Sequence, residues 1–159
     1  MVHSGAAVRF QSWNFTTEVE QRAIREQLER LRTVVARLSD DDLARELHGG
    51  WRVADALGHL AFYDRRAAVL LEKFGREGVS ASPYDYETIN QALLPLTRAM
   101  SPEAVRAEAI AAAEAADRAA AATPEALFAE IARRQEVKLA RAEHRRNHLD
   151  EIEAALAGG

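Results

Sequence analysis

Apolar residues recur at helical spacing through most of this 159-residue sequence, and this periodicity restricts the chain to helical architectures. A helix that packs on its neighbours buries one face, which places apolar side chains about three or four positions apart. The segment 16–38 shows this pattern, with intervals of three, four and five residues. Its apolar positions are Val19, Ala23, Leu28, Leu31, Val35 and Leu38.

Three further long helices are predicted after the first. The second covers residues 51–74, directly after the chain-breaking "HGG". The third starts with Ser101 as a favoured N-cap and Pro102 at the first helical position. The last begins at the similar Thr-Pro-Glu of residues 123–125 and is expected to continue unbroken to about Leu156.

Shorter elements join these helices. Ser39 is expected to cap one short turn of helix. The segment "DYETINQALLPLTRAM" predicts a shorter helix or a kinked pair, interrupted at Pro95 because proline disturbs a helix interior. No segment makes a convincing strand. The sequence therefore predicts an all-α four-helix bundle with one or two short extra helices, formed by residues 1–159 as a single domain.

Composition narrows the class of protein. Apolar residues make up 48% and charged residues 29%, as in an ordinary globular domain. The net charge of -4 argues against nucleic-acid binding, which usually needs a basic face. The absence of cysteine excludes disulfides and a protein thiol nucleophile. The sequence has neither a secretory signal pattern nor a run of roughly 20 apolar residues, so we expect a cytoplasmic protein without membrane association.

Two of the five histidines, His144 and His148, are four positions apart near the C-terminus. On a helix, positions four apart point the same way one turn apart, so both imidazoles can reach one cation. A solvated helix face is the competing interpretation of such a pair. A zincin is excluded because Arg145 follows the first histidine where that motif has glutamate. A ferritin-like di-iron site is excluded because its Glu-x-x-His pairs are missing.

The histidines and their surroundings resemble the DinB/YfiT-like superfamily of four-helix-bundle metalloenzymes. This group includes the N-terminal domain of mycothiol-dependent maleylpyruvate isomerase. The resemblance depends on Trp51 at a helix start, His59 within "ALGHL", and the HxxxH pair followed by leucine. The stretches "YDYETIN" and "MSPEAVRAEAIAAA" are also similar to that group. One departure is Arg52, where members often carry serine, which puts the capping of the second helix in doubt.

The resemblance implies that His59, His144 and His148 are three ligands of a divalent metal ion, with an open coordination position. Zinc and nickel are the favoured ions, although iron and manganese also accept imidazole. Three protein ligands and an open position are typical of catalytic rather than structural sites. In some members the resemblance implies transferase or isomerase chemistry with a low-molecular-weight thiol.

Four other residues are candidates for catalytic or supporting roles. Asp55 lies one turn before His59, where it either orients the imidazole, acts as a fourth ligand, or only offsets the helix dipole. Tyr63 is expected either to donate its hydroxyl toward the site or simply to pack. Arg66 and Arg141 are candidates for binding an anionic substrate, with solvent exposure as the alternative. Glu143 and Glu151 flank the histidine pair and are expected to be ordinary helix-surface charges. We assign no role to His48, in a loop, or to His3, in the N-terminal tail.

Several functions stay open at this point. The favoured one is a divalent-metal-dependent enzyme acting on a small molecule, as a thiol-dependent S-transferase or isomerase or as a hydrolase. The alternatives are a non-catalytic bundle that binds a ligand or partner, and a self-resistance protein that hydrolyses or sequesters a reactive metabolite. A homodimer is expected, because alanine-rich bundles often pair and the resemblance implies the same. The chain ends soon after His148, so the C-terminal domain of the isomerases is missing and their exact reaction is less expected.

Overall fold

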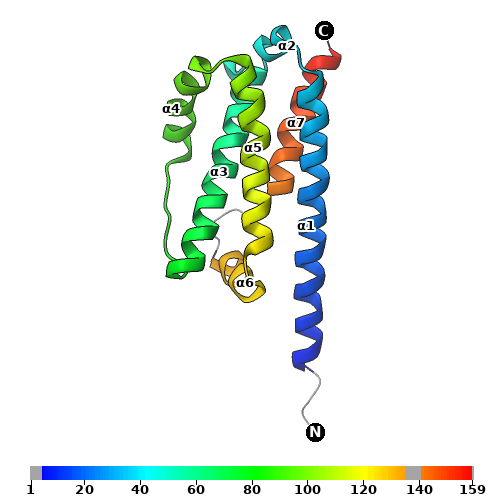
Figure 1. The fold of residues 1–159 in the computed structure, drawn as a ribbon, viewed down its shortest axis with the longest axis vertical. Helices are drawn as coiled ribbons and strands as arrows, with labels where there is room; N and C mark the ends of the chain where they lie inside the picture. The colour runs from blue at the N-terminus through cyan, green and yellow to red at the C-terminus, as the bar shows by residue number, and fades with distance from the viewer. Residues whose placement is uncertain (1–4, 135–140, 159) are drawn as a thin grey trace.

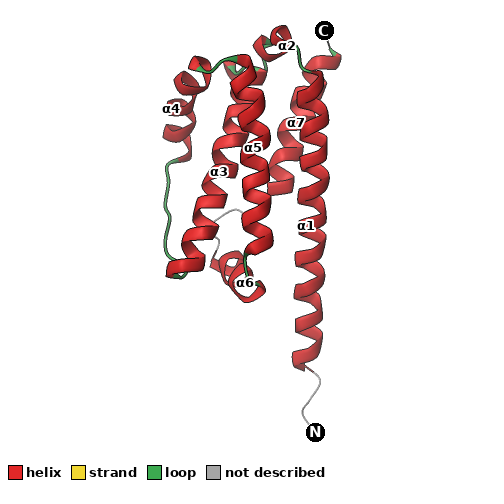
Figure 2. Cartoon of the chain, viewed as in Figure 1, coloured by secondary structure: helices red, strands yellow, loops and turns green. Residues whose placement is uncertain are grey.

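A computed structural model describes residues 5–134 and 141–158, with side chains from residue 18 onward. Within these ranges the chain forms α-helices, one turn of 3-10 helix and no strand (Figure 2). The all-α prediction is therefore confirmed. The elements are α1 (Gly5–Arg37), α2 (Asp40–Ala44), η1 (His48–Gly50), α3 (Val53–Glu77), α4 (Tyr86–Ala99), α5 (Pro102–Ala122), α6 (Glu125–Arg134) and α7 (Arg141–Ala157).

The four long helices α1, α3, α5 and α7 form the bundle (Figure 1). Helices α1 and α7 run in one direction, and α3 and α5 run in the other. The apolar clusters agree with this topology, since the starts of α3 and α5 share one cluster and their ends share a second. Two consecutive long helices can run parallel only if the segment that joins them returns the chain to the end where the first helix began. Residues 78–101, which include α4, make that crossover along the outside of α3.

Local signals in the sequence explain where several helices begin and end. The hydroxyl of Ser39 accepts a hydrogen bond from the backbone N–H of Asp42, and Ser101 caps α5 through the N–H of Ala104 in the same way. Both predicted caps are confirmed. Helix α3 ends at Gly78, whose φ of +82° favours glycine.

Arg52 makes no side-chain capping hydrogen bond at the start of α3, as the missing serine suggests, but Asp55 supplies one other contact there. The Asp55 carboxylate accepts a hydrogen bond of 2.9 Å from the backbone N–H of Arg52. It therefore satisfies one of the amides that a helix start leaves without a partner. The usual serine hydroxyl is not needed for this contact.

Three predicted features differ from the structure. Helix α1 begins at Gly5 rather than at Thr16. Pro95 lies inside the single helix α4, where it is exposed and the carbonyl that it leaves unpaired can reach water. The predicted continuous last helix is two helices, α6 and α7, which point in different directions in Figure 1. The residues that join them lie outside the described part of the chain.

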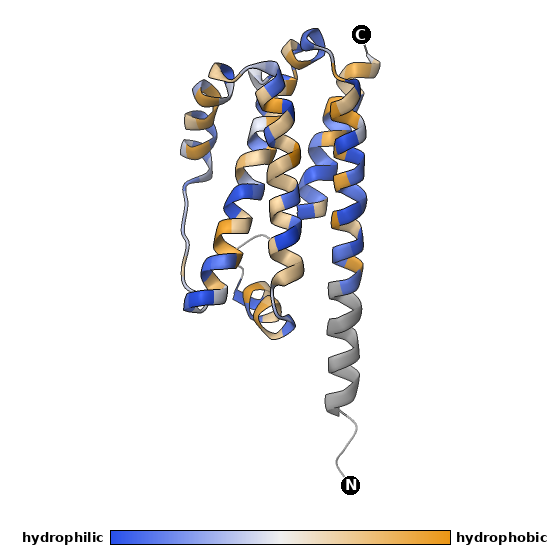
Figure 3. Ribbon diagram, in the orientation of Figure 1, coloured by the Kyte–Doolittle hydropathy of each residue, from blue (hydrophilic) through white to orange (hydrophobic). Residues whose placement is uncertain are grey.

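The bundle interior contains a polar layer between its two apolar clusters. One cluster gathers residues such as Leu31, Leu57 and Leu149, and the other gathers residues such as Leu71 and Ile131. Between them the fully buried side chains include charged and imidazole groups. Figure 3 shows hydrophilic residues in the middle of α3 and along α7. Among the described residues, no helix is both long and apolar enough to cross a membrane.

Helix α4 packs very closely on α3 at Gly58, which directly precedes His59. A Cβ added to Gly58 would lie 2.4 Å from Oγ1 of Thr97. We expect Gly58→Ala to lower the free energy of unfolding by about 1–3 kcal/mol, because this overpacking pushes α4 away. The matched control is Gly75→Ala in the same helix, where an added Cβ meets nothing within 4 Å. That change should raise stability by up to about 1 kcal/mol. Urea unfolding of both variants checks this, and equal effects would contradict it.

Candidate metal centre

Three histidine side chains from two helices converge in the polar layer. His59 comes from α3, and His144 and His148 come from α7. One nitrogen from each ring lies within 4.8 Å of the others. Nε2 of His59 is 2.9 Å from Nε2 of His144, and the three ring centroids lie 4.8–4.9 Å apart. Segments 85 residues apart in the chain therefore place their imidazoles around one point.

One of these distances matches the geometry of coordination to a single ion. Zinc binds histidine nitrogen at about 2.0–2.1 Å. Two such nitrogens are about 2.9–3.4 Å apart for angles between 90° and tetrahedral. The 2.9 Å separation of the Nε2 atoms of His59 and His144 falls within that range. All three nitrogens lie within 4.8 Å of one another, so the rings would have to move closer together to bind one ion.

The outer nitrogen of His59 is held by an asparagine that the crossover brings into place. Nδ1 of His59 lies 3.1 Å from Oδ1 of Asn90 in α4. The hydroxyl of Tyr63 donates to the same oxygen at 3.4 Å. The Trp51 ring packs edge-on against His59 with a centroid distance of 5.3 Å. An acceptor at Nδ1 fixes the ring and leaves the Nε2 lone pair for a metal.

His148 faces a carboxylate on its outer side. Its Nδ1 lies 3.4 Å from Oε2 of Glu151, and Oε1 of Glu151 is 2.6 Å from Nδ1 of His48. His48 is itself 87% exposed. A carboxylate behind a histidine is a common arrangement at metal sites, where it orients the ring and makes it a stronger ligand.

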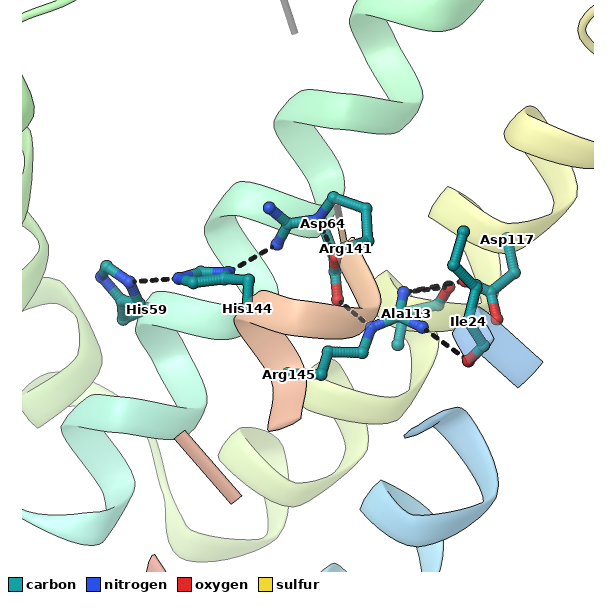
Figure 4. Close-up of polar contacts among 8 residues, drawn as sticks. All are labelled: Ile24, His59, Asp64, Ala113, Asp117, Arg141, His144 and Arg145. Atoms are coloured by element: carbon teal, nitrogen blue, oxygen red, sulfur yellow. Dashed lines mark hydrogen bonds and ion pairs between the residues drawn. The ribbon is translucent and has the colours of Figure 1, made fainter. Parts of the chain in front are cut away.

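His144 has a different neighbour on its outer side. Nη2 of Arg141 lies 2.8 Å from Nδ1 of His144, and Nε of Arg141 donates to Oδ1 of Asp64 at 2.7 Å (Figure 4). A guanidinium has no acceptor, so Nδ1 of His144 accepts this hydrogen bond. In a neutral ring, Nε2 of His144 then carries the hydrogen and points it toward Nε2 of His59.

A buried set of charges extends from Arg141 to the centre of the bundle (Figure 4). The other oxygen of Asp64 accepts from Nε of Arg145 at 3.0 Å. Arg145 is fully buried, and its Nη2 pairs with Asp117 at 2.8 Å. It also donates to the carbonyls of Ile24 in α1 and Ala113 in α5. Two aspartates thus balance two arginines where the four long helices meet.

The surroundings favour the neutral forms of His59 and His148. Burial lowers the pKa of His59 from 6.5 to about 4, and the nearby His148 and Arg141 add to this effect. Burial also lowers the pKa of His148, although Glu151 opposes the shift. Burial raises the pKa of Tyr63 to about 12, so its hydroxyl stays a hydrogen-bond donor. Neutral imidazoles are the form that binds metal ions.

The lowered pKa of His59 predicts a pH dependence of stability in metal-free protein. Between pH 6.5 and about 4 the unfolded state binds a proton that the folded state does not, so stability falls as pH falls through this window. The loss from His59 should reach at most about 3 kcal/mol. His59→Gln should flatten that part of the profile. Urea unfolding at several pH values in the presence of chelator measures it, and parallel profiles for both proteins would contradict it.

Residues 24–154 match the family described as the mycothiol maleylpyruvate isomerase N-terminal domain. The match covers most of the chain and includes all three histidines. The chain belongs to this family. No curated protein and no solved structure gives a significant match. The resemblance drawn from Trp51, His59 and the HxxxH pair is thereby confirmed at the level of the family.

In this member of the family, the donor set fits a divalent ion except at one contact. The three imidazoles converge, and the outer nitrogens of His59 and His148 lie beside groups that can accept a hydrogen. The exception is His144, whose outer nitrogen lies beside the donor Arg141.

Two of the predicted catalytic candidates do not contact the histidines in this domain. Asp55 is buried, but besides capping α3 it pairs with Arg98 of α4 at 3.0 Å. Neither role proposed for it at His59 is supported by these contacts. Arg66 donates to the carbonyl and hydroxyl of Ser82 at 2.9 Å and stacks on the Tyr84 ring. It thereby fastens the crossover segment to α3.

Several residues around the histidines in this family member were missed by sequence reasoning. Asp64 continues the buried stripe of Leu57, Leu60 and Leu71 at intervals of three and four, and a charge in that stripe was a usable signal. Arg145 holds the same place before Leu149 in α7. Glu151, to which no role was assigned, lies beside Nδ1 of His148 and pairs with the exposed His48. Asn90 ends the stretch "YDYETIN", whose similarity to the family was visible in the sequence, but no role was assigned to it.

Proposed function

We propose that His59, His144 and His148 bind one divalent metal ion and that the chain is a metal-dependent enzyme acting on a small molecule. The observation that carries this proposal is the convergence of three buried or half-buried imidazole nitrogens within 4.8 Å. Three histidines leave at least one coordination position for water or substrate, as in catalytic sites. Zinc and nickel are the proposed ions, because both accept imidazole.

A bound ion supplies Lewis acidity, which makes a coordinated water or thiol a stronger acid. The protein's own groups would do the rest. Asn90 and Glu151 orient two of the three rings. The Tyr63 hydroxyl, with its raised pKa, is placed to donate a hydrogen bond beside His59. Arg141 supplies a buried positive charge for an anionic group of the substrate.

We propose a low-molecular-weight thiol as the co-substrate, in an S-transferase or isomerase reaction. The family's description names mycothiol, and the chain has no cysteine of its own to provide sulfur. Hydrolysis with bound water is the second candidate, favoured by the same open position. A homodimer stays our expectation, and light scattering tests it, with a monomeric mass against it.

Cobalt-substituted protein separates the two reactions. After exchange of the ion for Co²⁺, addition of a small thiol such as glutathione or a mycothiol analogue should produce a thiolate-to-cobalt charge-transfer absorption. The matched control is the same addition to His144→Ala protein. Metal binding without any thiol-dependent absorption would contradict the thiol chemistry and favour hydrolysis. Failure to bind Co²⁺, Zn²⁺ or Ni²⁺ would contradict the metal site itself.

A further inference from the structure

Arg141 lies beside the three histidines, and its hydrogen bond to His144 conflicts with metal binding through that ring. Among the described contacts, the outer nitrogens of His59 and His148 face oxygen atoms. The outer nitrogen of His144 faces Nη2 of Arg141 at 2.8 Å. Histidines that bind a metal nearly always give their other N–H to an acceptor, which an arginine cannot be.

The conflict follows from the single hydrogen of a neutral imidazole. To bind an ion through Nε2, His144 must carry its hydrogen on Nδ1. An N–H at that position would point directly at the N–H of Arg141. The ion would also add positive charge beside the guanidinium, which already disfavours positive charge on His59 and His148. Both effects oppose metal binding while Arg141 stays in place.

Arg141 is held in this position by groups outside the histidine cluster. Its Nε donates to Asp64, and Asp64 is fixed in turn by the fully buried Arg145. The guanidinium is a rigid planar fork, so Nη2 can leave His144 only if the whole group shifts relative to Asp64. The contact with Asp64 therefore helps to hold Arg141 against the imidazole.

We propose that Arg141 competes with the metal ion for His144, and that metal binding moves the guanidinium away from the ring against the hold of Asp64. This inference rests on the proposed metal site. It makes Arg141 a determinant of metal affinity, and Asp64 the residue that positions it. Metal binding would then change where Arg141 holds its positive charge. The affinity for the metal ion and the affinity for an anion at Arg141 would therefore be coupled.

The test compares zinc affinity, measured by competition with a chromogenic chelator, for wild type, Arg141→Gln and Arg65→Gln. Glutamine removes the charge and offers an acceptor to Nδ1 of His144, so we expect Arg141→Gln to bind zinc about tenfold more tightly. Arg65 lies on the surface of α3 and pairs with Glu108, so its variant should match wild type. The double variant Asp64→Asn/Arg141→Gln avoids an unpaired buried carboxylate and should show the same gain if Arg141→Gln folds poorly.

Imidazole nitrogen shifts in ¹⁵N-labelled, metal-free protein provide the second measurement. We expect His144 to carry its hydrogen on Nε2 in wild type and on Nδ1 in Arg141→Gln. Equal or weaker zinc binding in both Arg141 variants would overturn this proposal and leave the metal site intact. A hydrogen on Nδ1 of His144 in wild type would also overturn it. No zinc binding by any of the proteins would overturn the proposed function as well.

Discussion

His144→Ala should lose the metal ion, with zinc affinity reduced by more than about a hundredfold. Even an outer partner of a ligand typically changes metal affinity by about 10- to 100-fold, and here a ligand itself is removed. Two imidazoles remain, and the deleted ring also lay between His59 and Arg141. The zinc content per chain after dialysis, measured by elemental analysis, should fall from about one to near zero. Circular dichroism and thermal unfolding without metal show whether the variant keeps its fold.

His48→Ala is the matched control for this experiment. His48 is another histidine close to the cluster, but it is largely exposed and pairs with the carboxylate that lies behind His148. Its removal should leave one zinc per chain and change the affinity by at most a few fold. A comparable loss of zinc in both variants would contradict the assignment of ligands. Full zinc binding by His144→Ala would exclude His144 as a ligand.

The largest effect on stability is expected for Arg145→Met. Arg145 is fully buried and pairs with both Asp64 and Asp117, so its removal leaves the half-buried Asp117 without this partner and the buried Asp64 with Arg141 alone. Breaking a buried ion pair in this way typically costs about 3–5 kcal/mol. That is a large share of the roughly 5–15 kcal/mol that stabilises an ordinary domain. Guanidinium unfolding measures the change.

The neighbouring Arg146 provides the matched control. It is exposed, so Arg146→Met should change stability by less than about 0.5 kcal/mol. The double variant Arg145→Met/Asp117→Asn also removes the negative charge that has lost its partner, and should recover part of the lost stability. A loss below about 1 kcal/mol in Arg145→Met would show that water or a rearrangement already satisfies the aspartates.

Much of the fold followed from the sequence because its signals are local. Helical periodicity and the caps at Ser39 and Ser101 depend only on nearby residues. The direction of each helix did not follow, since nothing local shows that α3 and α5 run parallel. The break between α6 and α7 was missed because the helix-forming residues continue without a glycine or proline. Pro95 was given too much weight, because an exposed helix tolerates the missing hydrogen bond.

The histidines of the candidate site could be predicted, whereas most of their supporting contacts could not. Two imidazoles on one helix follow from their spacing, and His59 was added by the resemblance to the family. The place of Asn90 depends on the crossover and on the close packing at Gly58, which are properties of the whole fold. Asp64 and Arg145 were visible as charges in apolar stripes, but their partnership with each other depends on how α3 and α7 face one another.

A crystal structure of zinc-loaded protein, with diffraction data on both sides of the zinc absorption edge, tests the central claim most directly. We expect one anomalous peak about 2.0–2.1 Å from a ring nitrogen of each of His59, His144 and His148, with Arg141 moved away from His144. A peak held by other residues, or His59 turned away from the ion, would contradict it.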